Sequence, residues 1–246
     1  MGFEFLFQPV EVVDEWLTGL IEGAPLLVAL SIAFVLGLRH ASDPDHLVAV
    51  TSLLAADRGD VRGATKLGAW WGVGHAVTLL AVGLPLIALK SQLPGWLEQG
   101  AETGVGLVIL VLAARVIVKW VRGDYRAGPH THAQHDHRHL HQGPGGGHHH
   151  RHLRTPRQAF GIGMLHGLAG TGAVVVLLIA ALPGRLEAAA ALAVFAPMSI
   201  VSMALCTSAF AWVLTRPVVA PLYRTVLVPA LGAFGLFFGL WYAGIT

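Results

Sequence analysis

The sequence predicts an all-α integral membrane protein. Of its residues, 54% are hydrophobic and only 12% are charged, and the mean hydropathy is +0.64, values far from those of a soluble domain. A helix needs roughly 20 apolar residues to cross a hydrocarbon core of about 30 Å. The 246 residues therefore leave room for about six transmembrane helices. Each should be helical because a lipid-exposed segment must satisfy its own backbone hydrogen bonds.

An amphipathic segment, residues 1–22, precedes the first span. It is acidic and carries apolar residues near helical spacing, which predicts a helix on the surface. It lacks the basic start and the uninterrupted apolar run of a secretory signal, so we expect it to be retained. The candidate spans that follow are about 24–42 with a continuation through 45–56, then 67–89, 103–121, 157–182, 188–214 and 225–244.

Basic residues gather in alternate loops. Twelve lie after the first, third and fifth spans, whereas the other connections carry only Lys90 and Arg185. By the positive-inside rule the basic loops lie in the cytoplasm, which puts both termini outside the inner (cytoplasmic) membrane. The net charge of +2 is too small to indicate a nucleic-acid partner. The single cysteine, Cys206, excludes an internal disulfide framework.

The chain also resembles itself. Residues 37–40 and 47–50 align without gaps to residues 163–166 and 173–176, at an offset of 126 positions. Three spans separate the copies, so the second copy enters the membrane from the opposite side, which is the inverted repeat of many secondary transporters. Chance similarity between two glycine-rich helices is the alternative. The repeat divides the chain into a first three-helix unit at 23–122, a loop at 123–156 and a second unit at 157–246.

The segment from Arg39 to His46 places two histidines and two aspartates at membrane depth. An ionisable side chain there costs about 2.5–3.5 kcal/mol, so such a cluster indicates a function. In an unbroken helix, His40 and His46 would lie about 120° apart in projection. Pro44 should break the helix at Asp43 and free the carbonyl of His40, so that both histidines can face one cation. A simpler interpretation is that Asp43 only caps the helix that Pro44 begins.

Two more histidines lie within the predicted spans. His75 follows Gly74, and His166 precedes Gly170; these glycines would also suit close helix packing. A lone membrane histidine often serves only as a hydrogen-bonding group between helices. Imidazole and carboxylate together suit Ni²⁺, Co²⁺ and Zn²⁺. The predicted metal-binding residues are His40, Asp43, Asp45, His46, His75 and His166.

At these residues the chain resembles the nickel/cobalt transporter (NiCoT) family, and most closely its shorter urease-associated permeases. The family signature, Arg-His-Ala-x-Asp-x-Asp-His, is complete from Arg39 to His46, and Gly74-His75 matches a second element. The resemblance implies that His40, Asp45 and His46 are required for metal recognition and transport, with Asp43 and His75 in support. The larger permeases have eight spans and an acidic Asp-Thr-x-x-Glu element, whereas this chain has His-Gly-Leu-Ala-Gly-Thr-Gly at 166–172.

The resemblance implies a secondary transporter with Ni²⁺ or Co²⁺ as transported substrate and no permanently bound cofactor. We favour uptake; efflux of excess metal and an accessory role in metal delivery without transport are the alternatives. An enzyme is not expected, because the apolar spans carry no nucleophile-base pair and no His-Glu-x-x-His element. The expected partners are divalent metal ions, membrane lipids and a cytoplasmic metal acceptor, and the sequence predicts no oligomeric state.

A histidine-rich tract fills the third loop. Its residues are polar or glycine with almost no apolar positions, so it cannot build a core, and we expect a disordered cytoplasmic segment that makes weak, multiple metal contacts. A solvated linker without a metal role is the alternative. The ten histidines of this tract are His130, His132, His135, His137, His139, His141, His148, His149, His150 and His152.

Overall fold

The computed structural model describes residues 3–21, 25–56, 61–123, 131–132, 135–136, 155–182, 184–214, 216 and 219–245. The helices of this part of the chain are α1 (Gln8–Gly19), α2 (Leu26–Arg39), α3 (Pro44–Ala56), α4 (Val61–Leu89), α5 (Gly95–Val121), α6 (Pro156–Ala181), α7 (Arg185–Leu214), α8 (Val219–Leu222) and α9 (Val228–Tyr242). Short 3-10 turns cover Phe3–Leu6 (η1) and His40–Ser42 (η2), and a π-helical turn (η3) covers Tyr223–Leu227. The all-α class is therefore confirmed.

Several of these helices match the predicted spans. Among the described residues, α4, α5, α7 and the segment Thr225–Tyr242 are long and apolar enough to cross a membrane, and α2 with α3 forms a fifth, bent candidate. Helix α6 has 26 residues, a length of about 39 Å at 1.5 Å per residue, and it coincides with the span predicted at 157–182. The fold is consistent with a multi-pass membrane protein, and six crossings stay a prediction.

The predicted break at Asp43-Pro44 is confirmed. Helix α2 ends at Arg39, η2 covers His40–Ser42, and Asp43 adopts an extended backbone with φ −62° and ψ 141°. Its carbonyl then accepts the first hydrogen bond of α3, from the Leu47 amide at 3.0 Å. The bend between the two halves is 46°, because Pro44 cannot continue a helix through His40.

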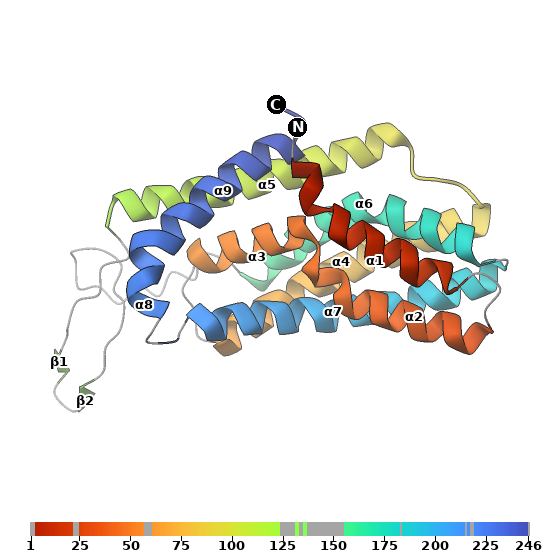
Figure 1. Cartoon of the computed structure of the whole chain (residues 1–246), viewed down its shortest axis with the longest axis horizontal. Coiled ribbons are helices and arrows are strands. Elements are labelled where there is room, and N and C mark those ends of the chain that lie inside the picture. Colours follow the sequence, from red (N-terminus) through yellow and green to blue (C-terminus); the bar gives the residue numbers. More distant parts are fainter. Residues whose placement is uncertain are drawn as a thin grey trace.

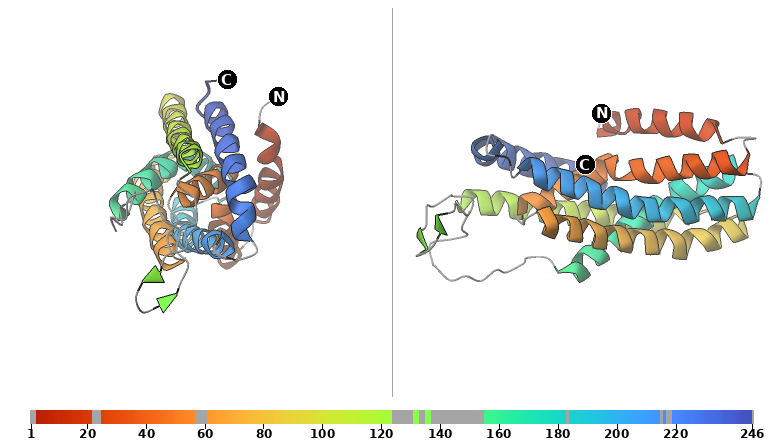
Figure 2. Two further views of the ribbon diagram at one scale, coloured as in Figure 1. Left: turned by 90° about the vertical axis from the view of Figure 1, so that its left-hand side faces the viewer. Right: turned by 90° about the horizontal axis from the view of Figure 1, so that it is seen from below.

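The long helices lie side by side as a bundle (Figures 1 and 2). Helix α4 packs along both α6 and α7, while α5 packs on α6 and α9, and α2 packs on α7. Helices α3, α5 and α7 end, and α4 and α6 begin, toward the left of Figure 1. This is the end where the basic loops attach, so the bundle alternates as the charge pattern predicted.

Helices α4 and α6 approach closely because glycines face the partner backbone. A Cβ atom added at Gly74 of α4 would collide with the carbonyl oxygen of Phe160, and one added at Gly163 of α6 would collide with that of Trp71. Reciprocal glycine contacts of this kind let two membrane helices touch through their backbones. They place His75 and His166 on adjoining surfaces of the two helices.

Helix α1 lies on the outside of the bundle and runs antiparallel to α2 (Figures 1 and 2). Aromatic contacts attach the start of the chain to α9, since the ring of Phe7 lies 5.7 Å from that of Trp241 and 6.3 Å from that of Phe238. Ile21, beyond its other end, is fully buried in the cluster formed with α2 and α7. Val12 and Trp16 face outward, with 63% and 65% of their surfaces exposed.

Candidate metal centre

Three histidines from separate elements meet inside the bundle. His40 lies in η2, His46 in the first turn of α3, and His75 in the middle of α4. One ring nitrogen from each lies within 4.8 Å of the others, and the three residues are 7%, 2% and 0% exposed. The Nε2 atoms of His40 and His75 are 2.9 Å apart. Such a group offers three imidazole ligands to one ion.

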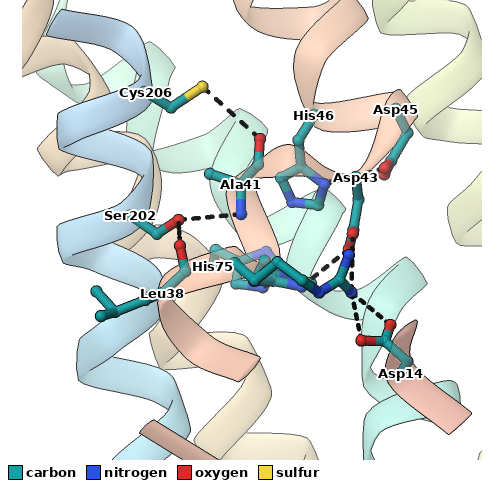
Figure 3. Close-up of polar contacts among 11 residues, drawn as sticks. Asp14, Leu38, Ala41, Asp43, Asp45, His46, His75, Ser202 and Cys206 are labelled. Atoms are coloured by element: carbon teal, nitrogen blue, oxygen red, sulfur yellow. Dashed lines mark hydrogen bonds and ion pairs between the residues drawn. The ribbon is translucent and has the colours of Figure 1, made fainter. Parts of the chain in front are cut away.

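The helix break accounts for this convergence. The rings of His40 and His46 lie 4.7 Å apart across the bend, although they would point about 120° apart in a continuous helix. Figure 3 shows His46 on the side of the turn that faces His75. The predicted inward turn of both histidines is therefore confirmed. The predicted free carbonyl of His40 is wrong, because that carbonyl accepts from the Asp43 amide at 3.2 Å in the 3-10 turn.

The two aspartates of the motif contact the histidines rather than joining their nitrogen cluster. Asp43 Oδ2 lies 3.0 Å from Nδ1 of His40, and Asp45 Oδ1 lies 3.0 Å from Nδ1 of His46. The Asp45 carboxylate accepts a hydrogen bond from Nδ1–H of His46, which fixes that tautomer and leaves its Nε2 with a lone pair, whereas Asp43 lies beside His40 at ion-pair distance. Among the described residues, Nε2 of His46 is buried without a hydrogen-bond partner. The motif thus presents basic nitrogen atoms oriented by carboxylates.

His166 lies beside this group. Its ring is 5.3 Å from that of His46, but it is not a member of the group of three. Its Nδ1 donates to the Ile162 carbonyl at 3.2 Å, and its Nε2 is buried without a partner in the described part of the chain. Trp71, which the sequence did not single out, lies beside both histidines, with its ring 5.4 Å from His46 and 5.3 Å from His166.

Helix α7 stabilises the backbone at the break. The hydroxyl of Ser202 donates to the Leu38 carbonyl and accepts from the Ala41 amide at 3.2 Å. The thiol of Cys206 donates to the Ala41 carbonyl at 3.7 Å (Figure 3). Side chains on a neighbouring helix thus satisfy groups that the break removes from the helical ladder. The sequence signal for these two contacts was weak, since serine and cysteine are common in apolar helices.

An ion-pair network joins α1 to the motif. Nη2 of Arg39 lies 2.5 Å from both carboxylate oxygens of Asp14 and 3.5 Å from Asp43, and Figure 3 shows Asp14 approaching from α1. Partial burial raises the pKa of Asp14, although Arg39 acts in the opposite direction. Sequence reasoning did not identify Asp14, because it lies 25 positions from Arg39 on a helix with several acidic residues.

The predicted histidine-rich tract lies mostly outside the described residues. Within it the structure describes only Thr131–His132 (β1) and His135–Asp136 (β2), which pair antiparallel so that His132 faces His135 in the register. The other eight histidines of the tract fall outside the described ranges. Its metal-binding role stays a prediction.

Comparison with known proteins identifies the family of this chain. The family model NicO, described as high-affinity nickel-transport protein, matches residues 26–225. A urease accessory protein, UreH, of Bacillus sp. (strain TB-90) is 29% identical over 62% of this chain and 62% of its own length. A high-affinity nickel transport protein of Cupriavidus necator is 32% identical over 47% of this chain and 35% of its own.

A plant protein is also similar. The chloroplast protein FOR GROWTH AND FERTILITY 1 of Arabidopsis thaliana is 28% identical over 69% of this chain and 46% of its own length. The chain thus spans less than two thirds of each of these relatives, and no solved structure matches it. Because the family model covers most of the chain, including the motif from Arg39 to His46, the protein belongs to the NicO family of nickel-transport proteins, as its resemblance at that motif predicted.

Proposed function

We propose that this chain carries Ni²⁺ or Co²⁺ across the cytoplasmic membrane as a secondary transporter, in the direction of uptake. The observation that carries the proposal is the group of three buried histidine nitrogens within 4.8 Å of one another, at a broken helix inside an apolar bundle. Broken helices at membrane depth occur where a site or pathway needs exposed polar groups. The metal is the substrate, and the family is one of transport proteins rather than enzymes.

In this proposal His40, His46 and His75 take over part of the hydration shell of the ion. Imidazole is a good ligand for these metals. The carboxylate of Asp45 acts through its hydrogen bond to Nδ1 of His46, and that of Asp43 through its charge, 3.0 Å from Nδ1 of His40. Such carboxylate partners raise the basicity of a ligating histidine. His166 receives the ion on leaving the first three ligands, because its Nε2 is a bare nitrogen beside the ring of His46.

We further propose that two inverted three-helix repeats form the bundle, with α2–α3, α4 and α5 equivalent to α6, α7 and α9. The packing supports this equivalence. Helix α2 packs on α7, and its proposed equivalent α6 packs on α4. Helix α5 packs on α6, and its proposed equivalent α9 packs on α3. The ring of His40 lies 5.2 Å from Phe195 of α7, and that of His166 lies 5.3 Å from Trp71 of α4. Both pairs are edge-to-face, although the offset of 126 positions aligns Phe195 with Ala69 and Trp71 with Pro197, so the contacts are similar without involving equivalent positions.

The orientation of the bundle follows from its charges. The helix ends that carry the basic loops gather at one end of the molecule (Figure 1), and the positive-inside rule puts that end in the cytoplasm, with both termini outside. The histidine-rich tract then lies on the cytoplasmic side, where it can hold metal that has crossed. A cytoplasmic acceptor protein would take the metal from there.

Purified protein in liposomes tests the transport proposal directly. With an imposed membrane potential, vesicles holding the wild type should accumulate Ni²⁺ faster than empty vesicles, and His46→Ala should remove that difference while His132→Ala retains it. The reason is that His46 is a buried member of the group of three, whereas His132 lies in the loop pair. Equal uptake by His46→Ala and wild type would remove the proposed site.

Uptake and efflux predict opposite changes in the metal content of cells. Uptake raises the metal content of cells that carry the protein, and efflux lowers it. The name of the Bacillus relative, a urease accessory protein, favours the third candidate, metal delivery without transport. Flux equal to that of empty vesicles, together with tight Ni²⁺ binding by the purified protein, would favour this accessory role.

A further inference from the structure

A groove lies between α5 and α6, on the opposite side of α6 from the backbone contacts with α4. Its volume is about 510 Å³, and its walls are mainly apolar, with Leu107 and Val111 on α5 and Leu165 on α6. Val111 is 58% exposed and Leu107 48% exposed, so the groove opens to the surroundings of the bundle. In a membrane those surroundings are lipid.

The lining changes character along the groove. Arg115 and Gln158 also line it, and both belong to the end of the bundle where the basic loops attach, since α5 finishes and α6 begins there. Leu107 precedes Arg115 by two helical turns, about 12 Å along the helix. The groove is therefore polar at the predicted cytoplasmic end and apolar toward the middle of the bundle.

Both polar residues can donate hydrogen bonds to an anion. Arg115 is exposed on an apolar helix, and a guanidinium there needs a counter-ion or access to the interface. The carbonyl oxygen of the Gln158 side chain accepts from the Thr155 amide at 3.1 Å as part of the capping box of α6. That bond fixes the carboxamide and leaves its NH₂ group as a donor.

We propose that this groove binds one anionic phospholipid. The phosphate is held by Arg115 and Gln158, and an acyl chain follows Val111, Leu107 and Leu165 toward the middle of the bundle. Basic pockets between membrane helices on the cytoplasmic side suit anionic head groups. A second copy of the chain fits less well, because it would need an acidic side chain to meet Arg115. The acidic residues of α5 and α7 (Glu98, Glu102 and Glu187) lie toward the starts of those helices, at the other end of the bundle from Arg115.

The groove adjoins the candidate metal centre. Leu165 lines it and directly precedes His166, while the carbonyl of Ile162, another lining residue, accepts the hydrogen bond from His166 Nδ1. A lipid chain in the groove packs against the turn of α6 that carries His166. Binding of the lipid is nevertheless independent of metal transport and can be measured without metal.

Lipid retention by the purified full-length protein tests the charge contribution. The protein in detergent is mixed with phosphatidylglycerol or phosphatidylcholine at equal concentration, and native mass spectrometry counts the lipids retained. We expect a preference of about fivefold for phosphatidylglycerol, the contribution of one basic side chain. Arg115→Gln should abolish this preference, whereas Arg185→Gln, a matched exposed arginine at the opposite end of the bundle, should keep it.

A second variant fills the groove without disturbing the fold. A Cβ atom at Gly161 meets nothing within 4 Å, and the same holds for Gly100 outside the groove. Gly161→Leu should therefore lose the retained phosphatidylglycerol, and Gly100→Leu should keep it. Equal retention by both glycine variants, no preference between the two lipids in the wild type, or displacement of the lipid by millimolar inorganic phosphate would each overturn the proposal. So would a dimer that only Gly161→Leu dissociates, since a second copy would then fill the groove.

Discussion

Replacing Asp14 by asparagine tests how the guanidinium of Arg39 is shared between two carboxylates. Arg39 lies 2.5 Å from Asp14 and 3.5 Å from Asp43, and Asp43 in turn contacts His40 at 3.0 Å. A divalent ion at His40 repels the guanidinium, which in the wild type can remain with Asp14. In Asp14→Asn the guanidinium keeps only Asp43 as an anionic partner, so it opposes the incoming ion.

The size of the effect follows from the exposure of the pair. The Arg39 and Asp14 side chains are 20% and 29% exposed, so solvent screens their attraction, and about 1 kcal/mol is a suitable value. That free energy corresponds to about a fivefold increase in the KM for Ni²⁺. The maximal rate should change less than about twofold, because no proposed ligand is altered.

Initial rates of Ni²⁺ uptake into proteoliposomes, at equal protein content, measure both quantities. Glu11→Gln and Glu15→Gln are matched controls, since both residues are exposed on the same helix. In an Arg39→Gln background the Asp14 substitution should have no further effect on KM, because no guanidinium is left to redistribute. An unchanged KM in Asp14→Asn, or an effect that persists in full without Arg39, would refute a guanidinium shared between the two carboxylates.

Three further predictions concern the backbone and the loop. Ser202→Ala should lower the free energy of unfolding by about 1–3 kcal/mol, since it removes a buried hydrogen bond to the Ala41 amide and a part-buried one to the Leu38 carbonyl; a thermal melt compared with Ser31→Ala, whose exposed hydroxyl bonds only within its own helix, checks this. Gly163→Ala should reduce the yield of folded protein, because its Cβ collides with the Trp71 carbonyl. Gly161→Ala, two positions away with open space, should express normally, and equal yields would contradict the packing argument. Deleting residues 130–152 should change the apparent affinity for Ni²⁺ more than the maximal flux, and complete loss of flux would make the tract part of the route.

The parts of the site that could be predicted from sequence are those determined by local chemistry. Pro44 removes a backbone donor and excludes the helix preceding it, so the break and the convergence of His40 and His46 followed without any knowledge of neighbours. Gly74, beside His75, likewise predicted close packing, which its contact with α6 confirms, whereas at Gly170, after His166, an added Cβ would make only an ordinary contact with the His75 ring. Both inferences need only the residue and its immediate neighbours in the chain.

Contacts over long sequence separations could not be predicted in this way. Ser202 meets Ala41 across 161 positions and Asp14 meets Arg39 across 25, and neither residue differs in type or spacing from others on its helix. Asp43 and Asp45 were predicted as part of the metal-binding set, and the structure adds that their oxygens contact the Nδ1 atoms of His40 and His46. Which atom of a carboxylate faces which nitrogen depends on rotamers that the sequence does not contain.

The predicted repeat pairs residues that the structure places in similar surroundings. The gap-free alignment paired His40 with His166, but nothing in it paired Phe195 with Trp71, which differ in residue type. In the structure each histidine nevertheless lies edge-on to an aromatic ring, His40 to Phe195 at 5.2 Å and His166 to Trp71 at 5.3 Å. Only the first unit carries Pro44 and His46, so the second contributes a histidine without a broken helix. In the proposed repeat the two units therefore share one architecture but play unequal parts in binding, with the three proposed ligands in the first unit and a single proposed receiving nitrogen in the second.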